Sequence, residues 1–400
     1  MQYRNDKYGN KLSILGFGCM RFPQTLGKID IKKTRELVAL AIDKGINYFD
    51  TAWLYPGIEE ALGTVLRELG KRKEIYIASK MPVMMCAKQK DLDKYFSVSL
   101  ERLKTEYIDY YLMHSLSDFA AWQKMRNLGA VEWIERQKKS GAIKQIGFSF
   151  HGSRVEFLKI LNDYDWDFCL IQYNYSDENY QAGKAGLKAA HEKGIPVIIM
   201  EPLLGGKLVN QLPKTALEAF KRDNPSLSPA ARGFLWLWNQ SEVTVVLSGM
   251  NAVSQLQENA ALTDSAYPGC LSNLGIYQTV RDEFKKSYKI HCTGCNYCQP
   301  CPKQINIPGC FSAYNVSYMM GLIEGIKQYV LSTGSHSPKP HGASNCIKCG
   351  KCEPHCPQNI PIRAELERVK KRLEPFYFRA AIRAIKTFWF KGQSGDSDNG

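Results

Sequence analysis

The chain has 400 residues, of which 44% are hydrophobic and 23% charged. This composition is typical of a globular protein and excludes a collagen-like, coiled-coil or disordered chain. The formal net charge is +14, but the basic residues are dispersed and no recognition motif is present, so we expect no nucleic-acid partner. No apolar run approaches the roughly 18 residues of a membrane span, and the N-terminus lacks an apolar signal core, so we expect a cytoplasmic protein.

The first 265 residues alternate short apolar runs, typical of strands, with longer segments of helical periodicity. The predicted strands are 11–18, 46–50, 74–79, 107–113, 143–149, 167–172, 196–200 and 243–247. The predicted helices are 31–44, 59–69, 92–103, 120–139, 154–161, 183–193, 214–222 with 228–238, and 252–262.

Strands separated by helices require right-handed crossovers and therefore a parallel sheet. Eight such units in about 255 residues favour a closed (β/α)8 barrel of the α/β class over an open doubly wound sheet. A hairpin of residues 2–4 with 11–13 is expected to close the bottom of this barrel. We therefore predict a barrel domain over residues 1–270.

The pattern changes after residue 265, where helices are predicted at 275–290, 311–331 and 363–373, with a Pro-, Gly- and Ser-rich linker at 332–344. We predict a small, mainly helical domain over residues 271–362 and a basic aromatic helix with a disordered tail over 363–400. For residues 376–390 we favour packing across the barrel or onto a second subunit, and contact with a membrane surface or with another partner is the less favoured alternative.

Eight of the 13 cysteines form two groups in this second domain. Group one has the spacing C-x2-C-x2-C-x2-C-P, and group two has C-x2-C-x2-C-x3-C-P, which is the iron–sulfur run of bacterial ferredoxins. In that run three closely spaced thiolates hold one [4Fe–4S] cluster and the fourth binds the other cluster. We therefore predict two clusters, one on Cys292, Cys295, Cys298 and Cys356 and the other on Cys346, Cys349, Cys352 and Cys301.

Zinc is the alternative ligand for paired C-x2-C motifs, but zinc ribbons need two pairs and not triplets that end in Cys-Pro. The clusters either carry electrons, which we favour, or only hold the domain together. Cys310 lies outside both groups and is expected to be a small buried hydrophobic residue.

Four polar residues lie where consecutive predicted strands end. Asp50 closes the second strand, Tyr55 follows it in the loop, Lys80 follows the third strand and His114 the fourth. The C-terminal ends of adjacent barrel strands converge on one mouth, where barrel active sites lie. An adjacent ammonium favours a phenolate and lowers the pKa of a tyrosine, so we predict a site in which Tyr55 transfers a proton, Asp50 orients Lys80 and His114 orients a carbonyl.

These residues, with LGFGCMR at 15–21 and the segments NYFDTAWLY, IASK and YYLMH, resemble the aldo-keto reductase family over residues 1 to 265. The tail resembles the ferredoxin-type extension, with two [4Fe–4S] clusters, that a subgroup of this family carries. The resemblance implies that Tyr55 protonates the oxygen of a small carbonyl substrate while a nicotinamide coenzyme, NADPH or NADH, delivers hydride to the carbon.

The resemblance also implies where the coenzyme binds. Ser149 and Gln172 match the residues that hold its carboxamide, and EPLLGGKL matches a loop that holds its pyrophosphate. The full set of implied coenzyme contacts is Met20, Arg21, Ser149, Gln172, Leu203, Gly205, Lys207, Gly249, Asn251, Gln255, Glu258 and Asn259.

Three positions depart from the family pattern: Phe150 replaces a usual Asn, Met200 replaces an aromatic residue that stacks on nicotinamide, and Gln255 replaces an arginine that grips a 2′-phosphate. The choice between NADPH and NADH therefore stays open. One alternative is an iron–sulfur reductase that takes electrons from ferredoxin or another redox partner, directly or through a bound flavin. The other is a non-catalytic electron-transfer subunit.

Overall fold

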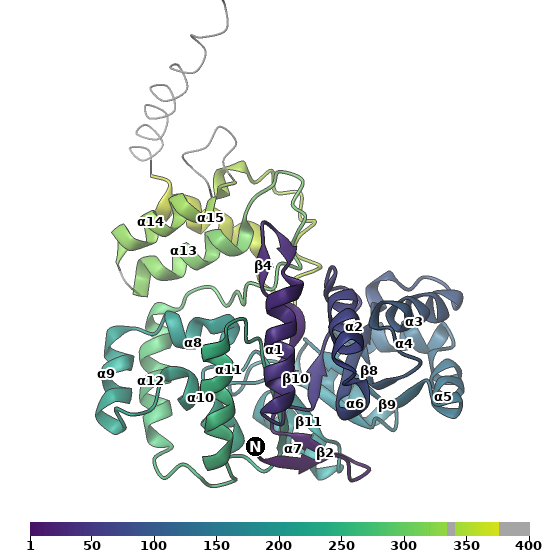
Figure 1. Ribbon diagram of the computed structural model, residues 1–400. Coiled ribbons are helices and arrows are strands. Elements are labelled where there is room, and N and C mark those ends of the chain that lie inside the picture. Colours follow the sequence, from purple (N-terminus) through teal and green to yellow (C-terminus); the bar gives the residue numbers. More distant parts are fainter. Residues whose placement is uncertain (320, 334–340, 376–400) are drawn as a thin grey trace, which may run out of the picture. The chain divides into compact units, whose positions relative to one another are not determined.

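The computed structural model describes residues 1–319, 321–333 and 341–375 (Figure 1). The chain divides into two compact units, of which the first comprises Met1–Leu203 with Leu227–Leu274 and the second Leu204–Ser226 with the described residues from Gly275 onward. No helix in the described part of the chain is long and apolar enough to cross a membrane. The predicted helix at 376–390 lies outside the described residues, and the domain boundaries at 270 and 362 stay predictions.

The first unit contains a closed barrel of eight parallel strands in the order β3-β6-β7-β8-β9-β10-β11-β12. The last strand pairs back onto the first, with Val246 opposite Leu15. The predicted (β/α)8 barrel is therefore confirmed. Its strands are β3 (Leu15–Gly18), β6 (Tyr48–Asp50), β7 (Tyr76–Met81), β8 (Ile108–Leu116), β9 (Ile143–Phe150), β10 (Phe168–Gln172), β11 (Val197–Met200) and β12 (Val243–Ser248).

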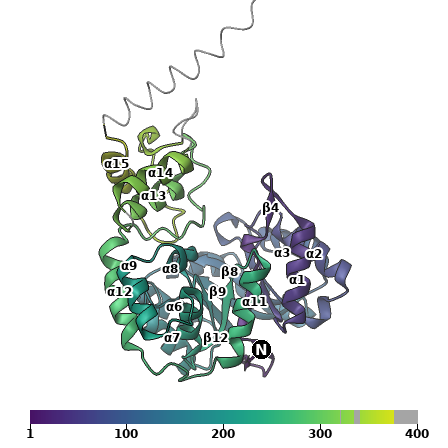
Figure 2. The same ribbon diagram turned by 60° about the vertical axis from the view of Figure 1, so that its left-hand side comes forward.

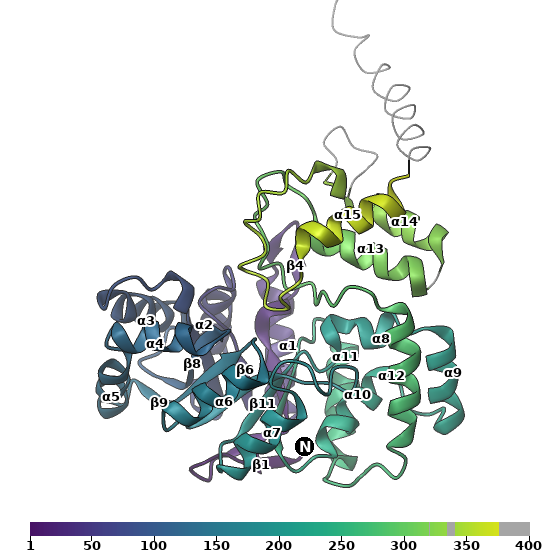
Figure 3. The same ribbon diagram turned by 180° about the vertical axis from the view of Figure 1, so that it is seen from behind.

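Helices follow the strands and cover the outside of the barrel, and Figure 3 shows α2 to α6 around β6, β8 and β9. The single helix predicted over 120–139 is wrong, because Gly129 adopts a left-handed φ of 80° that ends one helix and begins the next. The helices of this unit are α1 (Ile31–Asp43), α2 (Ile58–Leu69), α3 (Lys90–Leu103), α4 (Phe119–Asn127), α5 (Ala130–Ser140), α6 (Arg154–Asp163), α7 (Gly183–Glu192), α10 (Pro229–Trp238) and α11 (Val253–Leu262).

An antiparallel hairpin of β1 (Tyr3–Asn5) and β2 (Lys11–Ser13) closes the N-terminal end of the barrel, as predicted. Leu12 packs in one buried cluster with Tyr48 and Phe168, which begin their strands. The carboxylate of Asp6, in the hairpin turn, accepts a hydrogen bond of 2.6 Å from the hydroxyl of Tyr110. A second hairpin, β4 (Gln24–Thr25) with β5 (Lys28–Ile29), was not predicted.

The second unit is mainly helical, as predicted. Two of its helices, α9 (Lys214–Asp223) and α12 (Gly275–Ser287), lie side by side (Figure 2) and are joined by a hydrogen bond of 2.7 Å from Thr215 to Glu283. The single helix predicted over 311–331 is two helices, because Gly321 has a φ of 101°. Cys310 is fully buried in the apolar core, as expected. The remaining helices are α8 (Lys207–Asn210), α13 (Ile307–Met319), α14 (Leu322–Thr333) and α15 (Ile362–Leu373).

Gly63 permits a close approach of α2 to α3 beside the strands that carry the candidate site. A Cβ atom at Gly63 would lie 2.4 Å from the carbonyl oxygen of Arg102 and 2.6 Å from the carbonyl carbon of Leu103. Because backbone atoms cannot rotate away, we expect Gly63→Ala to lower the free energy of unfolding by about 1–3 kcal/mol. Urea unfolding followed by tryptophan fluorescence measures this change.

Arg67→Ala, on the exposed face of the same helix, is the matched control and should change the free energy of unfolding by less than about 0.5 kcal/mol. Equal stability of the Gly63→Ala variant and the unmodified protein would contradict the close helix contact.

Candidate active site and cysteine pockets

The structure brings the four predicted catalytic side chains together at the C-terminal ends of β6, β7 and β8. The ammonium nitrogen Nζ of Lys80 donates hydrogen bonds to Oδ1 of Asp50 at 2.7 Å and to the carbonyl oxygen of Thr51 at 2.6 Å. The centroid of the Tyr55 ring lies 5.3 Å from that nitrogen and 6.0 Å from the centroid of the His114 ring. Phenol, ammonium, carboxylate and imidazole are therefore neighbours.

Strand alternation explains why these side chains meet. Tyr48, Ala78 and Leu112 pack in one cluster inside the barrel. Alternate residues of a strand point to the same face, so the residue two positions further along each strand also faces inward. Those residues are Asp50, Lys80 and His114.

Burial controls the charges in this site. The exposed fractions of Lys80, Asp50 and His114 are 1%, 5% and 5%. Burial raises the pKa of Asp50 above its usual value, and the Lys80 ammonium opposes that rise. Burial, assisted by the charge of Lys80, lowers the pKa of His114 well below its usual value. The His114 imidazole is therefore neutral near pH 7 and offers one donor and one acceptor nitrogen.

The loop that carries Tyr55 is held by Arg102 of α3, a residue that the sequence analysis missed. The Arg102 guanidinium donates to the carbonyl oxygen of Trp53 at 3.3 Å and lies 4.9 Å from the centroid of the Trp53 ring. It also pairs at 3.3 Å with the fully buried carboxylate of Glu59, at the start of α2. No local motif identifies Arg102, because its partners are 43 and 49 positions away in the chain.

His151 was also missed, although it lies two positions after Ser149 and so continues the same face of β9. Its backbone N–H donates to the carbonyl oxygen of Leu116 at 2.9 Å, and burial lowers its pKa to about 4. After burial and the charge of Lys80, His151 is a third cause that lowers the pKa of His114. The turn that follows needs glycine, since a Cβ at Gly152 would lie 1.8 Å from the carbonyl oxygen of Ser117.

Several residues of the predicted coenzyme set already have partners within the protein. The hydroxyl of Ser149 accepts a hydrogen bond of 2.7 Å from the backbone N–H of Ser115, and Gln172 contacts Asp177 at 3.5 Å. Around the start of α11, the backbone N–H of Asn251 donates to Gln255 at 3.0 Å, Asn259 donates to Ser248 at 3.2 Å, and the hydroxyl of Ser228 donates to Glu258.

Two residues of the predicted coenzyme set, Arg21 and Gly249, lie against each other in the loops after β3 and β12. Met20 and Arg21 lie in a short 3-10 helix (Cys19–Arg21), and a Cβ at Gly249 would lie 2.9 Å from the Arg21 side chain. A glycine beside an arginine fits a group with phosphates. Of the predicted pyrophosphate loop, Leu203 belongs to the first unit, whereas Gly205 and Lys207 belong to the second.

The second unit has two cavities lined by cysteines, and they correspond to the two predicted ligand sets. One cavity is lined by Cys292, Cys295, Cys298 and Cys356. The other is lined by Cys301, Cys346, Cys349 and Cys352, with Cys298 at its wall. Burial and the neighbouring cysteines of its own set raise the pKa of Cys298.

Four soft sulfur donors around one cavity fit an iron–sulfur cluster. Within residues 1–319, 321–333 and 341–375, no group of three or more His, Cys, Asp or Glu side chains is placed to hold a single metal ion.

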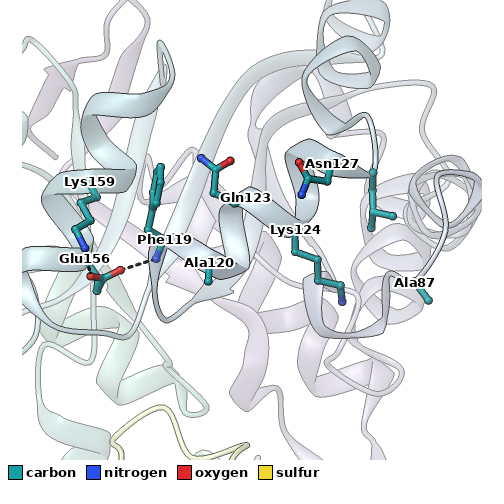
Figure 4. A pocket seen from close by; sticks show the side chains of 9 residues that line it. Ala87, Phe119, Ala120, Gln123, Lys124, Asn127, Glu156 and Lys159 are labelled. Carbon is teal, nitrogen blue, oxygen red and sulfur yellow. Dashed lines mark hydrogen bonds and ion pairs between the residues drawn. The ribbon is translucent and has the colours of Figure 1, made fainter.

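A further hollow lies on the outside of the barrel between α4 and α6 (Figure 4). The carboxylate of Glu156 accepts a hydrogen bond of 2.8 Å from the backbone N–H of Phe119 and pairs with Lys159 at 2.7 Å. None of the predicted site residues lines this hollow, so it is separate from the candidate active site.

Comparison with known proteins agrees with this geometry. Residues 14–268 match the Aldo/keto reductase family, and residues 291–360 match the 4Fe-4S dicluster domain. The chain is 23% identical over 299 residues to the aldo-keto reductase yakc [NADP(+)] of Schizosaccharomyces pombe, covering 65% of this chain and 86% of that protein. It is 26% identical over 306 residues to L-galactose dehydrogenase of Arabidopsis thaliana, covering 69% and 90%.

Two solved structures share the barrel fold. The holo form of aldo-keto reductase AKR11C1 from Bacillus halodurans has a TM-score of 0.57 at 23% identity, covering 70% of this chain and 96% of that chain. The aldo-keto reductase from Klebsiella pneumoniae in complex with NADPH has a TM-score of 0.58 at 20% identity, covering 70% and 95%. Because the family match spans more than half of the chain, the protein belongs to the aldo/keto reductase family of oxidoreductases and carries an iron–sulfur domain C-terminal to its barrel.

Proposed function

We propose that the protein reversibly reduces a carbonyl group of a small molecule to an alcohol with a nicotinamide coenzyme. The observation that carries this proposal is the position of the Tyr55 ring, 5.3 Å from the Lys80 ammonium and 6.0 Å from the neutral ring of His114. A phenol beside an ammonium is suited to give up and take back a proton at neutral pH.

The bound coenzyme supplies hydride to the carbonyl carbon. Tyr55 donates its hydroxyl proton to the carbonyl oxygen, and the Lys80 ammonium stabilises the phenolate that remains. Asp50 keeps that ammonium in place through its hydrogen bond of 2.7 Å. His114 is buried and neutral, so it orients the carbonyl oxygen by hydrogen bonding. In the reverse direction Tyr55 takes the alcohol proton.

For the coenzyme, we propose Ser149 and Gln172 at the carboxamide and Arg21 with Gly249 at the phosphates. Ser149 and Gln172 lie on the neighbouring strands β9 and β10, and this supports their assignment to one group of the coenzyme. NADPH is the coenzyme to test first, because one relative is named for NADP(+) and one structural neighbour was solved with NADPH.

We further propose that the second unit holds two [4Fe–4S] clusters, one in each cysteine-lined cavity, and that they transfer electrons. The two separate sets of four cysteines support this number. A redox partner protein would then exchange electrons with this unit. Proton transfer by Tyr55 needs no electron from the second unit.

Replacing the phenol with a benzene ring should remove the proton donor and leave the clusters in place. We expect Tyr55→Phe to lower kcat for carbonyl reduction at least about 10²-fold, the typical contribution of general acid catalysis. Coenzyme oxidation at a fixed carbonyl concentration measures this, and iron content with visible absorbance checks the clusters.

Tyr267→Phe is the matched control, because Tyr267 is 60% exposed. Wild-type turnover in the Tyr55→Phe variant would remove Tyr55 from the mechanism.

The buried neutral His114 should make stability depend on pH. Its pKa lies well below its ordinary value of 6.5, so between these two pKa values the unfolded chain binds a proton that the folded chain does not. The free energy of unfolding should therefore fall as pH decreases below 6.5, and His114→Asn should reduce this slope by up to about 1.4 kcal/mol per pH unit. Urea unfolding at several pH values measures this slope for the unmodified protein and for His114→Asn. The same slope in both would show that His114 is protonated in the folded protein below pH 6.5.

Variants of single cysteines can test whether the fourth cysteine of each group binds the cluster held by the other group. Cys356 belongs to group two in the sequence but lines the cavity of Cys292, Cys295 and Cys298. The electron paramagnetic resonance spectrum of reduced Cys356→Ala should therefore match that of Cys295→Ala and differ from that of Cys349→Ala. A spectrum that matches Cys349→Ala instead would show that each sequence group binds its own cluster.

A further inference from the structure

The two cysteine-lined cavities differ in the charge of their surroundings. The residues around the cavity of Cys292, Cys295, Cys298 and Cys356 include no charged side chain. The residues around the cavity of Cys301, Cys346, Cys349 and Cys352 include Lys303, Lys351 and Arg363, and no acidic side chain. The second cavity therefore has a positive rim that the first one lacks.

Part of this difference comes from the loops that carry the cysteines. In group two the positions between the cysteines hold Lys348 and Lys351, in the segment CIKCGKC at 346–352. In group one the corresponding segment, CTGCNYC at 292–298, has no charged residue. The other two cations of the rim come from elsewhere, since Lys303 follows Cys301 and Arg363 lies at the start of α15.

This rim is also the accessible one. Cys349 is exposed, whereas Cys292 of the other set is buried. Beside Cys349, Ile347 is 58% exposed and the Lys348 side chain 63% exposed. We call the surface formed by Lys303, Ile347, Lys348, Cys349 and Lys351 the Cys349 edge.

The lysines of the Cys349 edge are largely available to a partner. Lys303 and Lys351 make no ion pair within the described residues, and Lys348 makes one long contact of 3.7 Å with Glu367. Arg363, by contrast, is engaged with Glu353 at 2.7 Å. Exposed pairs as long as that of Lys348 contribute little stability, so a carboxylate from a partner can replace Glu367.

Resting on the proposed electron transfer by the second unit, we propose that the Cys349 edge docks an acidic one-electron carrier protein, and that electrons enter or leave the chain at this cavity. Ile347 is an apolar residue with lysines around it, and such a surface is complementary to a carrier whose small apolar patch is surrounded by carboxylates. The reduced carrier gives one electron to the iron–sulfur group, so the carrier is oxidised and the iron–sulfur group is reduced by one electron. No bond forms or breaks and no proton moves.

The test uses the full chain with its iron, kept anaerobic, and a reduced clostridial-type ferredoxin as the acidic probe. Calorimetry gives Kd, and stopped-flow absorbance gives the second-order rate of cluster reduction. We expect Lys348→Glu/Lys351→Glu to raise Kd and to lower that rate at least about tenfold at low salt. The difference should shrink as ionic strength rises toward about 0.3 M, because salt screens exposed charges.

The matched control is Lys221→Glu/Lys285→Glu, which makes the same change of charge on α9 and α12 of the same unit. The control should bind within about twofold of the unmodified protein, since neither Lys221 nor Lys285 lines either cysteine cavity. Equal weakening in both double variants would show that the net charge of +14 attracts the carrier without a specific edge. Unchanged binding of Lys348→Glu/Lys351→Glu would overturn the proposal directly.

Photoreduction with neutral 5-deazariboflavin separates docking from loss of the cluster, because an uncharged reductant does not depend on the lysines. Photoreduced 5-deazariboflavin should reduce the Lys348→Glu/Lys351→Glu variant as fast as it reduces the unmodified protein. If the double variant loses iron, Lys303→Glu replaces it, because Lys303 lies outside the group-two loop. Lys303→Glu should then weaken ferredoxin binding at least about threefold at low salt, and wild-type affinity would overturn the proposal.

Discussion

The candidate active site depends on one buried ammonium. Lys80 is 1% exposed, and its charge is tolerated there because Asp50 and the carbonyl oxygen of Thr51 accept its hydrogen bonds. In the proposed mechanism that charge supports a phenolate on Tyr55. Burial, assisted by the same charge, lowers the pKa of His114 and keeps its imidazole neutral. The barrel makes the arrangement possible, since its closure brings the ends of three consecutive strands to one mouth.

In the proposed function the two units transfer different numbers of electrons. Hydride transfer moves two electrons together, whereas an iron–sulfur cluster passes one at a time. Coupling the two would need a two-electron mediator such as a bound flavin. The proposed Tyr55 reaction and the proposed Cys349 edge are therefore separable, and failure of either proposal leaves the other intact.

Much of the fold was predictable because short apolar runs and helical periodicity survive in single segments. All eight barrel strands follow from such patterns, and the position of Asp50, Lys80 and His114 at consecutive strand ends predicted that they meet. The two helices that were wrong contain Gly129 and Gly321, whose positive φ angles end a helix without interrupting the helical periodicity of the sequence. Arg102 was not predictable, because its hold on Trp53 and Glu59 is a contact between distant parts of the chain. The pairing of Cys356 with group one could be predicted, because the ferredoxin spacing itself encodes it.

The most direct test of the central claim follows the hydride. The protein is supplied with NADPH carrying deuterium at the transferred position and with a small carbonyl compound, and the alcohol is analysed by mass spectrometry. Our account predicts one deuterium on the former carbonyl carbon for each coenzyme oxidised, with no redox partner present. Alcohol without deuterium, or formed only when a reduced carrier is added, would contradict it, because the hydride would then have passed through an exchanging mediator or not come from the coenzyme.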